Sequence, residues 1–481
     1  MFTRSGRRAA GRAAGGRSAV RVSGGSRGSV GPASGHRGRI GANTFPLCPF
    51  GLRRRGDCEG RAEGAVRVGI VGGGIAGLSC ALSLHAAGFR PWVSESARAI
   101  EAVGVGINLL PHAVRELAEL GLADGLASIG LEPRRLRYYD RGGTPVWDEP
   151  VGTAAGYRWP QHSVHRGRLH ALLLAAVRER LGPDAVRTGR RLRHFETVPG
   201  GVRAHFLDRP SGTTVVEHAE VLIGADGVDS AVRARLHPHE GAARRHGVLM
   251  WRGIAPHPRL LDGRSLVVAG GTPGAKFVAY PIAPAVGPGV DLLNWVLEVP
   301  DEPPSGGPVT PADVRPVTAS EARARLREWH LPWIDLPALV EHTSAVFAYA
   351  MVDRDPLPFW SAGRVTLLGD AAHPILPMGM NGGSQSVVDA RVLAWCLARE
   401  ADPETALRYY DELRRPVLNA LVLANRALGP EEIIARAAEH GGPLPVERAA
   451  ALSRRYKETS RATVADVNDH PSWNVPRPDA R

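Results

Sequence analysis

The 481-residue chain is poor in cysteine and has no long apolar run. Its four cysteines, Cys48, Cys58, Cys80 and Cys396, contain no CxxC pair, and the last two lie in probable helices. This spacing excludes a disulfide framework and a zinc site of the usual kind, and it indicates a reducing compartment. Because no stretch of about twenty apolar residues occurs, the sequence predicts no membrane span, and we expect a cytoplasmic protein.

The basic excess of the chain is confined to its first residues. The formal net charge is +12, but residues 1–64 hold thirteen arginines and three acidic residues, a balance of +10. The remaining residues therefore contribute only about +2. A nucleic-acid partner needs its basic surface on the folded domain, so this distribution argues against such a partner.

Residues 1–64 form an Arg- and Gly-rich leader. They offer little to bury, so we expect them to be disordered. Their acid-poor composition is weakly similar to a transit peptide, and they lack the apolar run of a secretory signal. The alternative is that the true start lies downstream, and in either case we expect the leader to have no function in the mature protein.

The folded part opens with the stretch VRVGIVGGGIAGLSCALSLHAAGFRPWVSES. Its apolar pattern predicts a strand over 66–71, a helix from Ile75 to about Gly88, and a second strand that ends at Glu95. Between the first strand and the helix stands GxGxxG, formed by Gly72, Gly74 and Gly77. The strand before, the helix after and the acid about twenty residues on make this motif specific for a bound dinucleotide.

Each part of this element has a physical reason. Gly72 makes the tight turn, Gly74 admits the pyrophosphate, and Gly77 lets the helix pack closely on the strand. The pyrophosphate then lies against the unpaired N–H groups of the helix N-terminus, around Ile75 and Ala76. Glu95 is placed to accept a hydrogen bond from an adenosine ribose. This motif alone leaves NAD and FAD open.

Two later stretches repeat the pattern of a strand broken by small residues. EVLIGADGVDSAVRARL (220–236) contains Asp226-Gly227, followed by a helix that carries Arg233. RVTLLGDAAHPILPMGMNGG (364–383) contains Gly369-Asp370 and then a loop of prolines and glycines. A carboxylate at the end of a buried strand is costly unless it is hydrogen-bonded, so Asp370 calls for a partner.

These motifs resemble those of the single-component FAD monooxygenases, the flavin-dependent aromatic hydroxylases with the p-hydroxybenzoate hydroxylase-like fold. That family carries GxGxxG near its start, a DG motif in mid-chain and a GD motif before a proline- and glycine-rich loop, in the order seen here. The resemblance runs from about residue 65 to about residue 430. The stretches GVGINLLPHAV, SVHRGRLHALLLAAVRERLG and GRVTLLGDAAHPILPMGMNGGSQ most resemble those of the 5-methylphenazine-1-carboxylate monooxygenases.

The resemblance implies an α/β fold, with a Rossmann-like FAD-binding domain, an inserted mixed-sheet substrate domain and C-terminal helices. We assign 65–240 and 351–430 to the FAD-binding domain and 241–350 to the substrate sheet. Residues 431–481 are expected to form a C-terminal helix and tail. The helix predicted after residue 400 should be interrupted near Pro416.

The resemblance also implies contacts with FAD. Asp370 would accept hydrogen bonds from the ribityl chain, and Arg166 and Asp226 are carried over as a flavin contact and a residue near the pyrophosphate. The backbone N–H groups from Gly379 to Gly383 would face the edge of the flavin that is anionic when reduced. Bulky side chains would block the ring there, which would explain the glycines. Beyond the first turn, the predicted cofactor contacts are Gly106, Arg166, Asp226, Gly369, Asp370, Pro377, Gly379, Asn381, Gly382 and Gly383.

Strands predicted within 240–350 supply candidate walls for a substrate. Trp251, Arg252, Tyr280 and Trp295 are the predicted substrate contacts, and Arg252 would meet a substrate carboxylate. The alternative is that these side chains pack beneath the sheet. Lys276 is a further candidate cation.

The resemblance implies a cycle in which NADH or NADPH docks transiently and reduces FAD. O2 then reacts, and one oxygen atom passes from a flavin C4a-hydroperoxide to the ring of a planar aromatic substrate, phenazine-like or a small aromatic carboxylic acid. FAD carries this chemistry, so no side chain is assigned a catalytic role and no metal is expected. We expect a monomer or a homodimer.

Two alternatives share the FAD framework. One is a dehydrogenase or reductase that oxidises an aromatic metabolite without inserting oxygen. The other is a flavin-bound interaction protein that has lost its chemistry, against which the intact glycine turns argue. A halogenase is disfavoured because its paired-tryptophan motif and catalytic lysine have no clear match.

Overall fold

The computed structural model describes residues 66–100, 104–272, 275–301 and 314–475. The expectations for the leader, for Cys48 and for Cys58 lie outside these residues. Cys80 and Cys396 are buried and free. None of the helices in the described ranges combines the length and apolarity that a membrane crossing requires.

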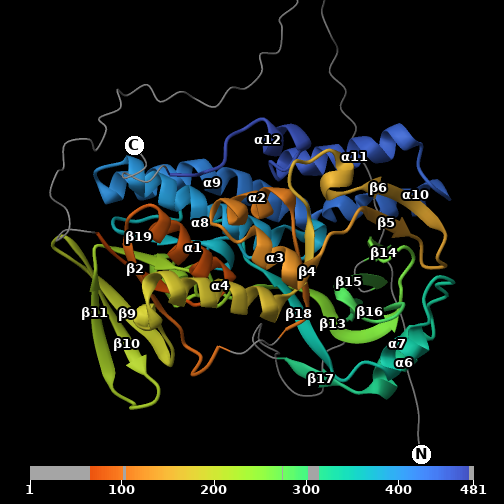
Figure 1. Ribbon diagram of the computed structural model, residues 1–481, viewed down its shortest axis with the longest axis horizontal. Helices are drawn as coiled ribbons and strands as arrows, with labels where there is room; N and C mark the ends of the chain where they lie inside the picture. The colour runs from red at the N-terminus through yellow and green to blue at the C-terminus, as the bar shows by residue number, and fades with distance from the viewer. Residues whose placement is uncertain (1–65, 101–103, 273–274, 302–313, 476–481) are drawn as a thin grey trace, which may run out of the picture. The chain divides into compact units, whose positions relative to one another are not determined.

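A parallel sheet forms the nucleotide-binding half of the molecule. Its five strands are entirely parallel and run in the order β19-β12-β1-β2-β8, with bounds Val365–Leu367, Val221–Gly224, Arg67–Val71, Arg90–Ser94 and Val186–Arg187. The apolar residues of these strands are buried, as expected of a sheet covered on both faces. Helices α4 (Arg166–Leu181) and α8 (Asn381–Arg399) pack against α1 (Ile75–Ala86) (Figure 1).

Two small sheets accompany it. Strands β9 (Arg190–Val198), β10 (Gly201–Asp208) and β11 (Thr214–Ala219) form an antiparallel sheet. Strands β3 (Gly106–Leu109), β7 (His162–His165) and β4 (Gly130–Leu131) form the other. Two short helices, α2 (Pro111–Glu119) and α3 (Ala123–Ile129), lie between β3 and β4 in the chain, and α5 (Ala231–Leu236) follows β12.

The second large unit is a mixed sheet of eight strands in the order β17-β18-β13-β16-β15-β14-β5-β6. The bounds are Arg315–Val317, Val346–Asp353, Arg244–Pro258, Val290–Pro300, Ala275–Gly287, Ser265–Thr272, Arg135–Tyr139 and Pro145–Pro150. One face packs against α6 (Ala319–Leu326) and α7 (Leu336–Glu341) around an apolar cluster. The expected inserted mixed sheet is confirmed.

The sheet draws strands from outside the range assigned to it. Strands β5 and β6 lie within 65–240, the range assigned to the FAD-binding domain. They join the eight-stranded sheet because β5 pairs in parallel with β14, from Ser265↔Arg135 to Ala269↔Tyr139. Strand β18 likewise extends past residue 350. The sheet therefore extends into both neighbouring segments.

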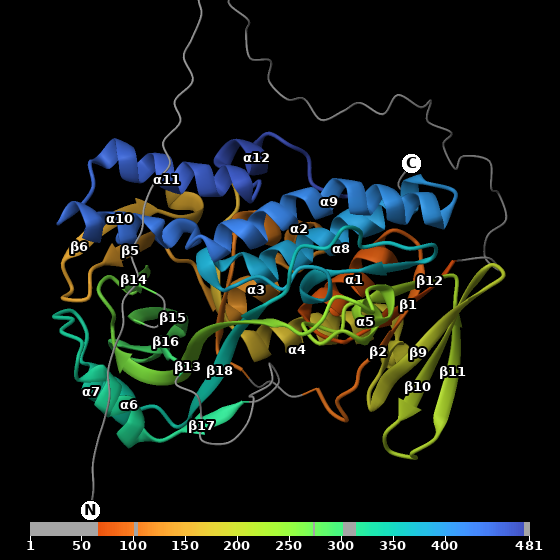
Figure 2. The ribbon, with the colours of Figure 1, turned by 180° about the vertical axis from the view of Figure 1, so that it is seen from behind.

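The C-terminal part is helical and partly differs from expectation. Helix α9 (Pro403–Arg426) runs uninterrupted through Pro416, so the predicted interruption is wrong. Pro416 lies on the exposed side, where water can satisfy the carbonyl that loses its helical hydrogen bond. Beyond it lie η5 (Gly429–Glu431), α10 (Glu432–His440), α11 (Val446–Thr459) and α12 (Val464–Asn468), which Figure 2 shows along the same side as α9.

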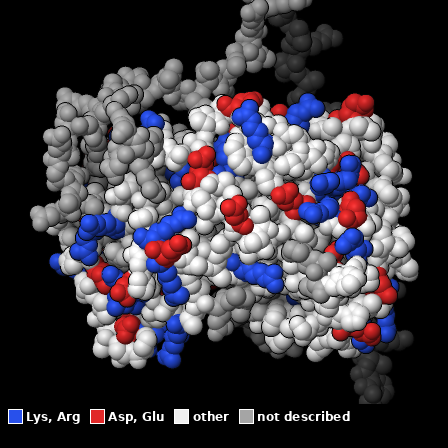
Figure 3. All heavy atoms as spheres, in the orientation of Figure 1, with Lys and Arg blue, Asp and Glu red and all other residues white. Residues whose placement is uncertain are grey.

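Charged side chains of both signs alternate over the face drawn in Figure 3, and no single basic patch gathers on its described part. This fits the near-neutral balance of the residues after the leader.

Candidate functional site

The three glycine-marked turns converge at one edge of the parallel sheet. Strand β12 lies between β1 and β19, so the turns at their carboxyl ends are neighbours. A Cβ on Gly72, whose φ is +105°, would collide with the carbonyl oxygen of Ala225, directly before the DG motif. A Cβ on Gly369 would come within 2.9 Å of the Ala76 side chain in the first turn of α1. Segments about 300 residues apart thus meet as predicted.

The first turn offers a site for a phosphate. Gly74 is the N-cap of α1, no side chain caps this helix, and its first turn holds no acidic residue. A Cβ on Gly74 would meet nothing within 4 Å, so the space before the free N–H groups is open. Glu95 accepts hydrogen bonds from the N–H groups of Gly73 and Ala97, both at 2.7 Å. Glu95 thus fixes the turn, and its contact with a ribose stays a prediction.

The aspartate of the DG motif is hydrogen-bonded to the start of the helix that follows it, α5. Asp226 accepts hydrogen bonds from Ala231 N–H at 2.7 Å and from the Ser230 hydroxyl at 2.5 Å. Burial raises the pKa of this carboxyl, while these hydrogen bonds oppose the rise. Both partners belong to the start of α5, so Asp226 shapes the motif, and its place near the pyrophosphate stays a prediction.

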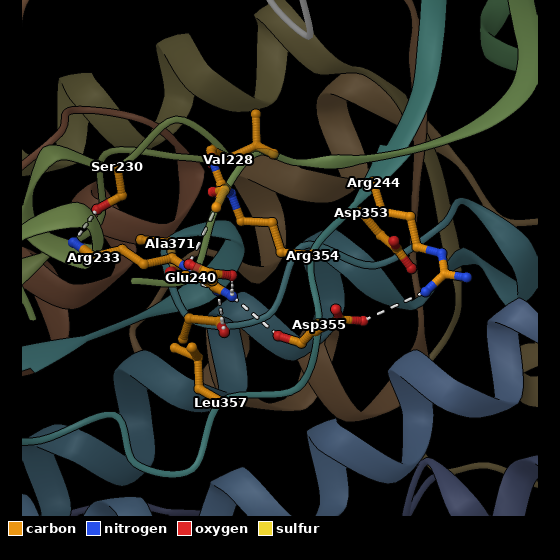
Figure 4. Close-up of polar contacts among 12 residues, drawn as sticks. Val228, Ser230, Arg233, Glu240, Arg244, Asp353, Arg354, Asp355, Leu357 and Ala371 are labelled. Atoms are coloured by element: carbon orange, nitrogen blue, oxygen red, sulfur yellow. Dashed lines mark hydrogen bonds and ion pairs between the residues drawn. The ribbon is translucent and has the colours of Figure 1, made fainter. Parts of the chain in front are cut away.

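Arg233 joins the DG motif to the GD motif, a role that the sequence did not reveal. Its side chain is 1% exposed, and Nη1 donates to the carbonyls of Ala371 and Ala372 at 3.1 and 2.8 Å. Glu240 accepts from its Nε at 2.7 Å (Figure 4). Arg354 secures the same region by donating to Val228 O at 2.8 Å. The backbone beside Asp370 is therefore held from the neighbouring motif.

Asp370 is presented without a protein partner. It is exposed in the short turn after β19, and its carboxylate makes no hydrogen bond within the described ranges. Gly369 N–H is held by Asp389 at 3.3 Å, and Asp389 pairs with His373 at 2.5 Å and with Arg414 at 2.7 Å. His373 is thus engaged in a buried hydrogen bond with Asp389, and Asp370 remains available to a ligand.

In the glycine-rich turn, two of the glycines lack a side chain because protein atoms pack against them, which differs from the prediction that they make room for the flavin. A Cβ on Gly379 would overlap the ring of Tyr456 from α11, and one on Gly383 would come within 2.8 Å of Ile107. Only at Gly382 would a Cβ meet nothing within 4 Å. The expectation that the glycines clear space for the flavin therefore fits Gly382, whereas protein atoms fill the space beside Gly379 and Gly383.

The residues that follow this turn open helix α8. No side chain caps α8, and its first turn holds no acidic residue. Asn381 is buried and donates to Gly379 O at 3.1 Å, while Pro377 is exposed. The free N–H groups beside Gly382 can therefore face a partly anionic group.

A cavity of about 70 Å³ adjoins this turn, walled among others by Met380, Tyr138 and helix α11. It is about half the size of an engineered cavity of about 150 Å³ that binds benzene. A substituent or water fits it, and a ring system does not.

These observations fit FAD. Two uncapped helix N-termini border open space at Gly74 and Gly382, and an unpartnered carboxylate, Asp370, lies where the strands end. A pyrophosphate, a ribityl chain and a pyrimidine ring need these groups in this order.

The eight-stranded sheet turns one face to this site. Arg252 donates from Nη2 to Gly106 O at 3.0 Å, and Asn294 accepts from Gly106 N–H at 2.6 Å. Tyr280 lies on the same face and hydrogen-bonds to Arg252. The backbone of Gly106 is thus hydrogen-bonded to two side chains of the eight-stranded sheet, and this is where β3 contacts that sheet.

Trp251 and Trp295 lie on the other face. Both belong to the apolar cluster beneath α6 and α7, where Trp295 donates to the Thr343 hydroxyl at 3.0 Å. Strand alternation separates them from Arg252. The structure thus groups Arg252 with Tyr280 and sets the two tryptophans apart. Lys276 is also engaged, at 2.6 Å from Glu298 and 2.8 Å from Glu431.

Arg252 lacks an acidic partner. No carboxylate pairs with it in the described part of the chain, and its Nε is buried without a hydrogen bond. Burial lowers the pKa of the guanidinium, and the positive charge of Arg166 adds to the shift. Arg166, exposed at the start of α4, is anchored by its N–H to Val105 O at 2.9 Å. Arg166 and Arg252 thus place two positive charges near β3, and among the described residues no carboxylate forms an ion pair with Arg252.

Comparisons with known proteins agree with this geometry. The family described as "FAD binding domain" matches residues 65–425. The chain is 45% identical over 367 residues to phenazine 1,6-dicarboxylic acid hydroxylase PhzS of Lysobacter antibioticus, covering 74% of this chain and 88% of that protein. It is 31% identical over 363 residues to 6-hydroxynicotinate 3-monooxygenase of Bordetella bronchiseptica, covering 73% and 88%.

Solved structures show the same fold. Klebsiella pneumoniae HpxO, complexed with FAD and uric acid, superposes with a TM-score of 0.66 at 23% identity, covering 84% of this chain and 98% of that one. A 2,6-dihydroxypyridine-3-hydroxylase from Arthrobacter nicotinovorans gives 0.63 at 24% identity, covering 80% and 96%.

Proposed function

This chain belongs to the FAD-binding family of flavin-dependent aromatic monooxygenases, and we propose that its substrate is a planar aromatic carboxylic acid of the phenazine type. It is an FAD-dependent hydroxylase that uses NAD(P)H and O2. One oxygen atom enters the ring and the other leaves as water, while NAD(P)H is oxidised. We further propose that it acts in the cytoplasm as a monomer or homodimer.

Bound FAD supplies the oxygen chemistry, and the chain supplies position, charge and exclusion of water. The start of α1 binds the pyrophosphate, Asp370 orients the ribityl chain, and the start of α8 stabilises negative charge on the pyrimidine ring. The sheet face beside Arg252 adds buried apolar residues, among them Val268 and Ile282. Such a lining keeps water from the reacting atoms.

The observation that supports a carboxylate on the substrate is the unpaired Arg252. A partly buried guanidinium without an acid is costly, and a ligand anion lowers that cost. Arginine also matches a carboxylate with two parallel hydrogen bonds. The curated relative acts on a phenazine dicarboxylic acid by its name, which is consistent with this pairing.

The test replaces Arg252 and compares charged with uncharged substrates. Loss of one hydrogen bond between charged groups costs about 1.5–3 kcal/mol, or roughly ten- to hundredfold in affinity. We therefore expect Arg252→Gln to raise KM for phenazine carboxylates by about that factor and to leave KM for unsubstituted phenazine nearly unchanged. Arg135→Gln, which removes a partly exposed arginine paired with Asp148 in the same sheet, is the matched control.

Product analysis under ¹⁸O2 accompanies these assays. Incorporation of one labelled oxygen is the expected result. An oxidised product without label would support a dehydrogenase instead, and an equal KM change for charged and uncharged rings would refute the role given to Arg252.

A further inference from the structure

The turn before α8 is held in an unfavourable backbone conformation. Gly379 (φ 65°, ψ 11°) and Met380 (φ 60°, ψ 25°) both adopt the left-handed region, one after the other. Glycine accepts this region freely, but a residue with a side chain does so only where its surroundings fix it. Something in the fold must therefore hold Met380.

The hydroxyl of Tyr456, in α11, supplies much of that restraint. It lies 3.1 Å from Met378 O and 2.8 Å from Oδ1 of Asn425, and it accepts from Nδ2 of Asn381 at 3.1 Å. Asn425 in turn donates to the carbonyls of Leu376 and Met378 at 2.8 and 3.1 Å. Residues on both sides of the strained pair are thus bound by one buried cluster.

The ring of Tyr456 contributes as well. It occupies the position that a side chain at 379 would take, and it approaches Gly429 on its other side. A second link joins the C-cap of this helix to α8: Gln385 donates to Ser460 O at 3.0 Å. Helix α11 therefore contacts the turn through Tyr456, and its C-cap contacts the first part of α8.

Helix α11 lies outside the part of the chain that the family match covers, which ends at residue 425. The turn lies inside that part, and so does the start of α8, which directly follows the turn. A segment beyond the family match thus supports the turn where the pyrimidine edge of FAD is proposed to lie.

We propose that Tyr456 is a positioning residue for the flavin, holding the 378–381 turn so that the N-terminus of α8 points at the pyrimidine edge. This proposal rests on the proposed FAD site. Its consequence is electrostatic: a displaced helix N-terminus stabilises the reduced, anionic flavin less well.

The test compares Tyr456→Phe with Tyr157→Phe. Tyr157 lines the same cavity as Tyr456, and it is a matched control because its hydroxyl makes a buried hydrogen bond to the C-terminal segment, to Ala462 O at 2.6 Å, instead of to the turn. Tyr157→Phe loses one buried hydrogen bond and Tyr456→Phe loses the contacts with Met378, Asn425 and Asn381, so both should lose thermal stability, Tyr456→Phe the more. Only Tyr456→Phe should weaken FAD binding, by about two- to tenfold, and shift the flavin midpoint potential to more negative values.

Asn425→Ser is the second variant, because it removes one acceptor of the Tyr456 hydroxyl together with the donor to the carbonyls of Leu376 and Met378, and leaves the Tyr456 ring in place. It should shift FAD affinity and potential in the same direction. Equal flavin properties in Tyr456→Phe, Tyr157→Phe and wild type would overturn the inference while leaving the proposed function intact. A wild-type protein that takes up no FAD would instead overturn the proposed function.

Discussion

Asp370 is the residue whose replacement tests the cofactor site most directly. Its backbone is fixed independently of its side chain, through Gly369 N–H on Asp389 and through Arg233 on the carbonyls of Ala371 and Ala372. The carboxylate itself is exposed and makes no hydrogen bond among the described residues. Removing it should therefore change ligand binding and leave the folded apoprotein nearly as stable, within about 0.5 kcal/mol.

The expected magnitude follows from the chemistry of the missing contact. A hydrogen bond from a ribityl hydroxyl to a carboxylate contributes about 1.5–3 kcal/mol, and one to a neutral acceptor about 0.5–1.5 kcal/mol. Asp370→Ala should therefore raise the Kd for FAD by roughly ten- to hundredfold. Asp370→Asn keeps one acceptor oxygen and should fall between this variant and wild type.

The assay is a titration of apoprotein with FAD, followed by quenching of flavin fluorescence, together with thermal melts of the apoproteins. Asp124→Ala makes the same change of charge at an exposed position of α3 and serves as the control. If Asp370→Ala bound FAD within twofold of wild type, the ribityl chain would not lie at Asp370, and the order of contacts proposed for the cofactor would be refuted.

Two further predictions concern the rest of the molecule. Trp295→Phe should lower the melting temperature and leave KM for a phenazine carboxylate unchanged, because Trp295 is fully buried beneath α6 and α7; a raised KM would return it to the substrate site. The second concerns His112, where burial and the nearby cations Arg414 and Arg115 lower the pKa to about 3. The unfolded chain binds a proton there below about pH 6.5 and the native state does not, so this group alone should cost wild type roughly 1.4 kcal/mol of stability per pH unit as the pH falls below that value. Urea unfolding at about pH 7.5 and about pH 5 should show a smaller loss for His112→Leu than for wild type, and parallel losses would refute this assignment.

The convergence of the three turns was predictable because each turn carries its own local signature. Strand, glycine turn and helix stand together in sequence around Gly72, and parallel strands place the ends of β1, β12 and β19 at one edge. Periodicity also located the sheet strands that carry Arg252 and Tyr280. Periodicity does not say which face of the sheet is turned to the glycine-marked turns, so the sequence alone does not separate Trp251 and Trp295 from Arg252 and Tyr280.

What the sequence did not reveal depends on contacts between distant segments. The pairing of β5 with β14 joins residues more than 100 positions apart, and the bonds from Arg233 to Ala371 and Ala372 span 138 and 139. Lys276 gave no sign in sequence that Glu298 and Glu431 neutralise it. Pro416 predicts a helix break because proline has a low helix propensity, which is a local property. The helix continues because Pro416 lies on its exposed side, where water can bind the carbonyl that has no helical partner.

The glycines of the late loop separate two physical reasons for lacking a side chain. At Gly382, as at Gly74 in the first turn, a Cβ would meet nothing within 4 Å, which is consistent with the proposed cofactor contact. At Gly379 and Gly383 protein atoms already fill that space, so packing explains the missing side chain. The sequence alone does not distinguish a glycine that borders open space from one packed against protein atoms, because the residue is the same in both. Because the packing at Gly379 comes from Tyr456, the geometry of the cofactor turn depends on a helix near the end of the chain, and changes in that helix should alter the flavin as well as the stability of the fold.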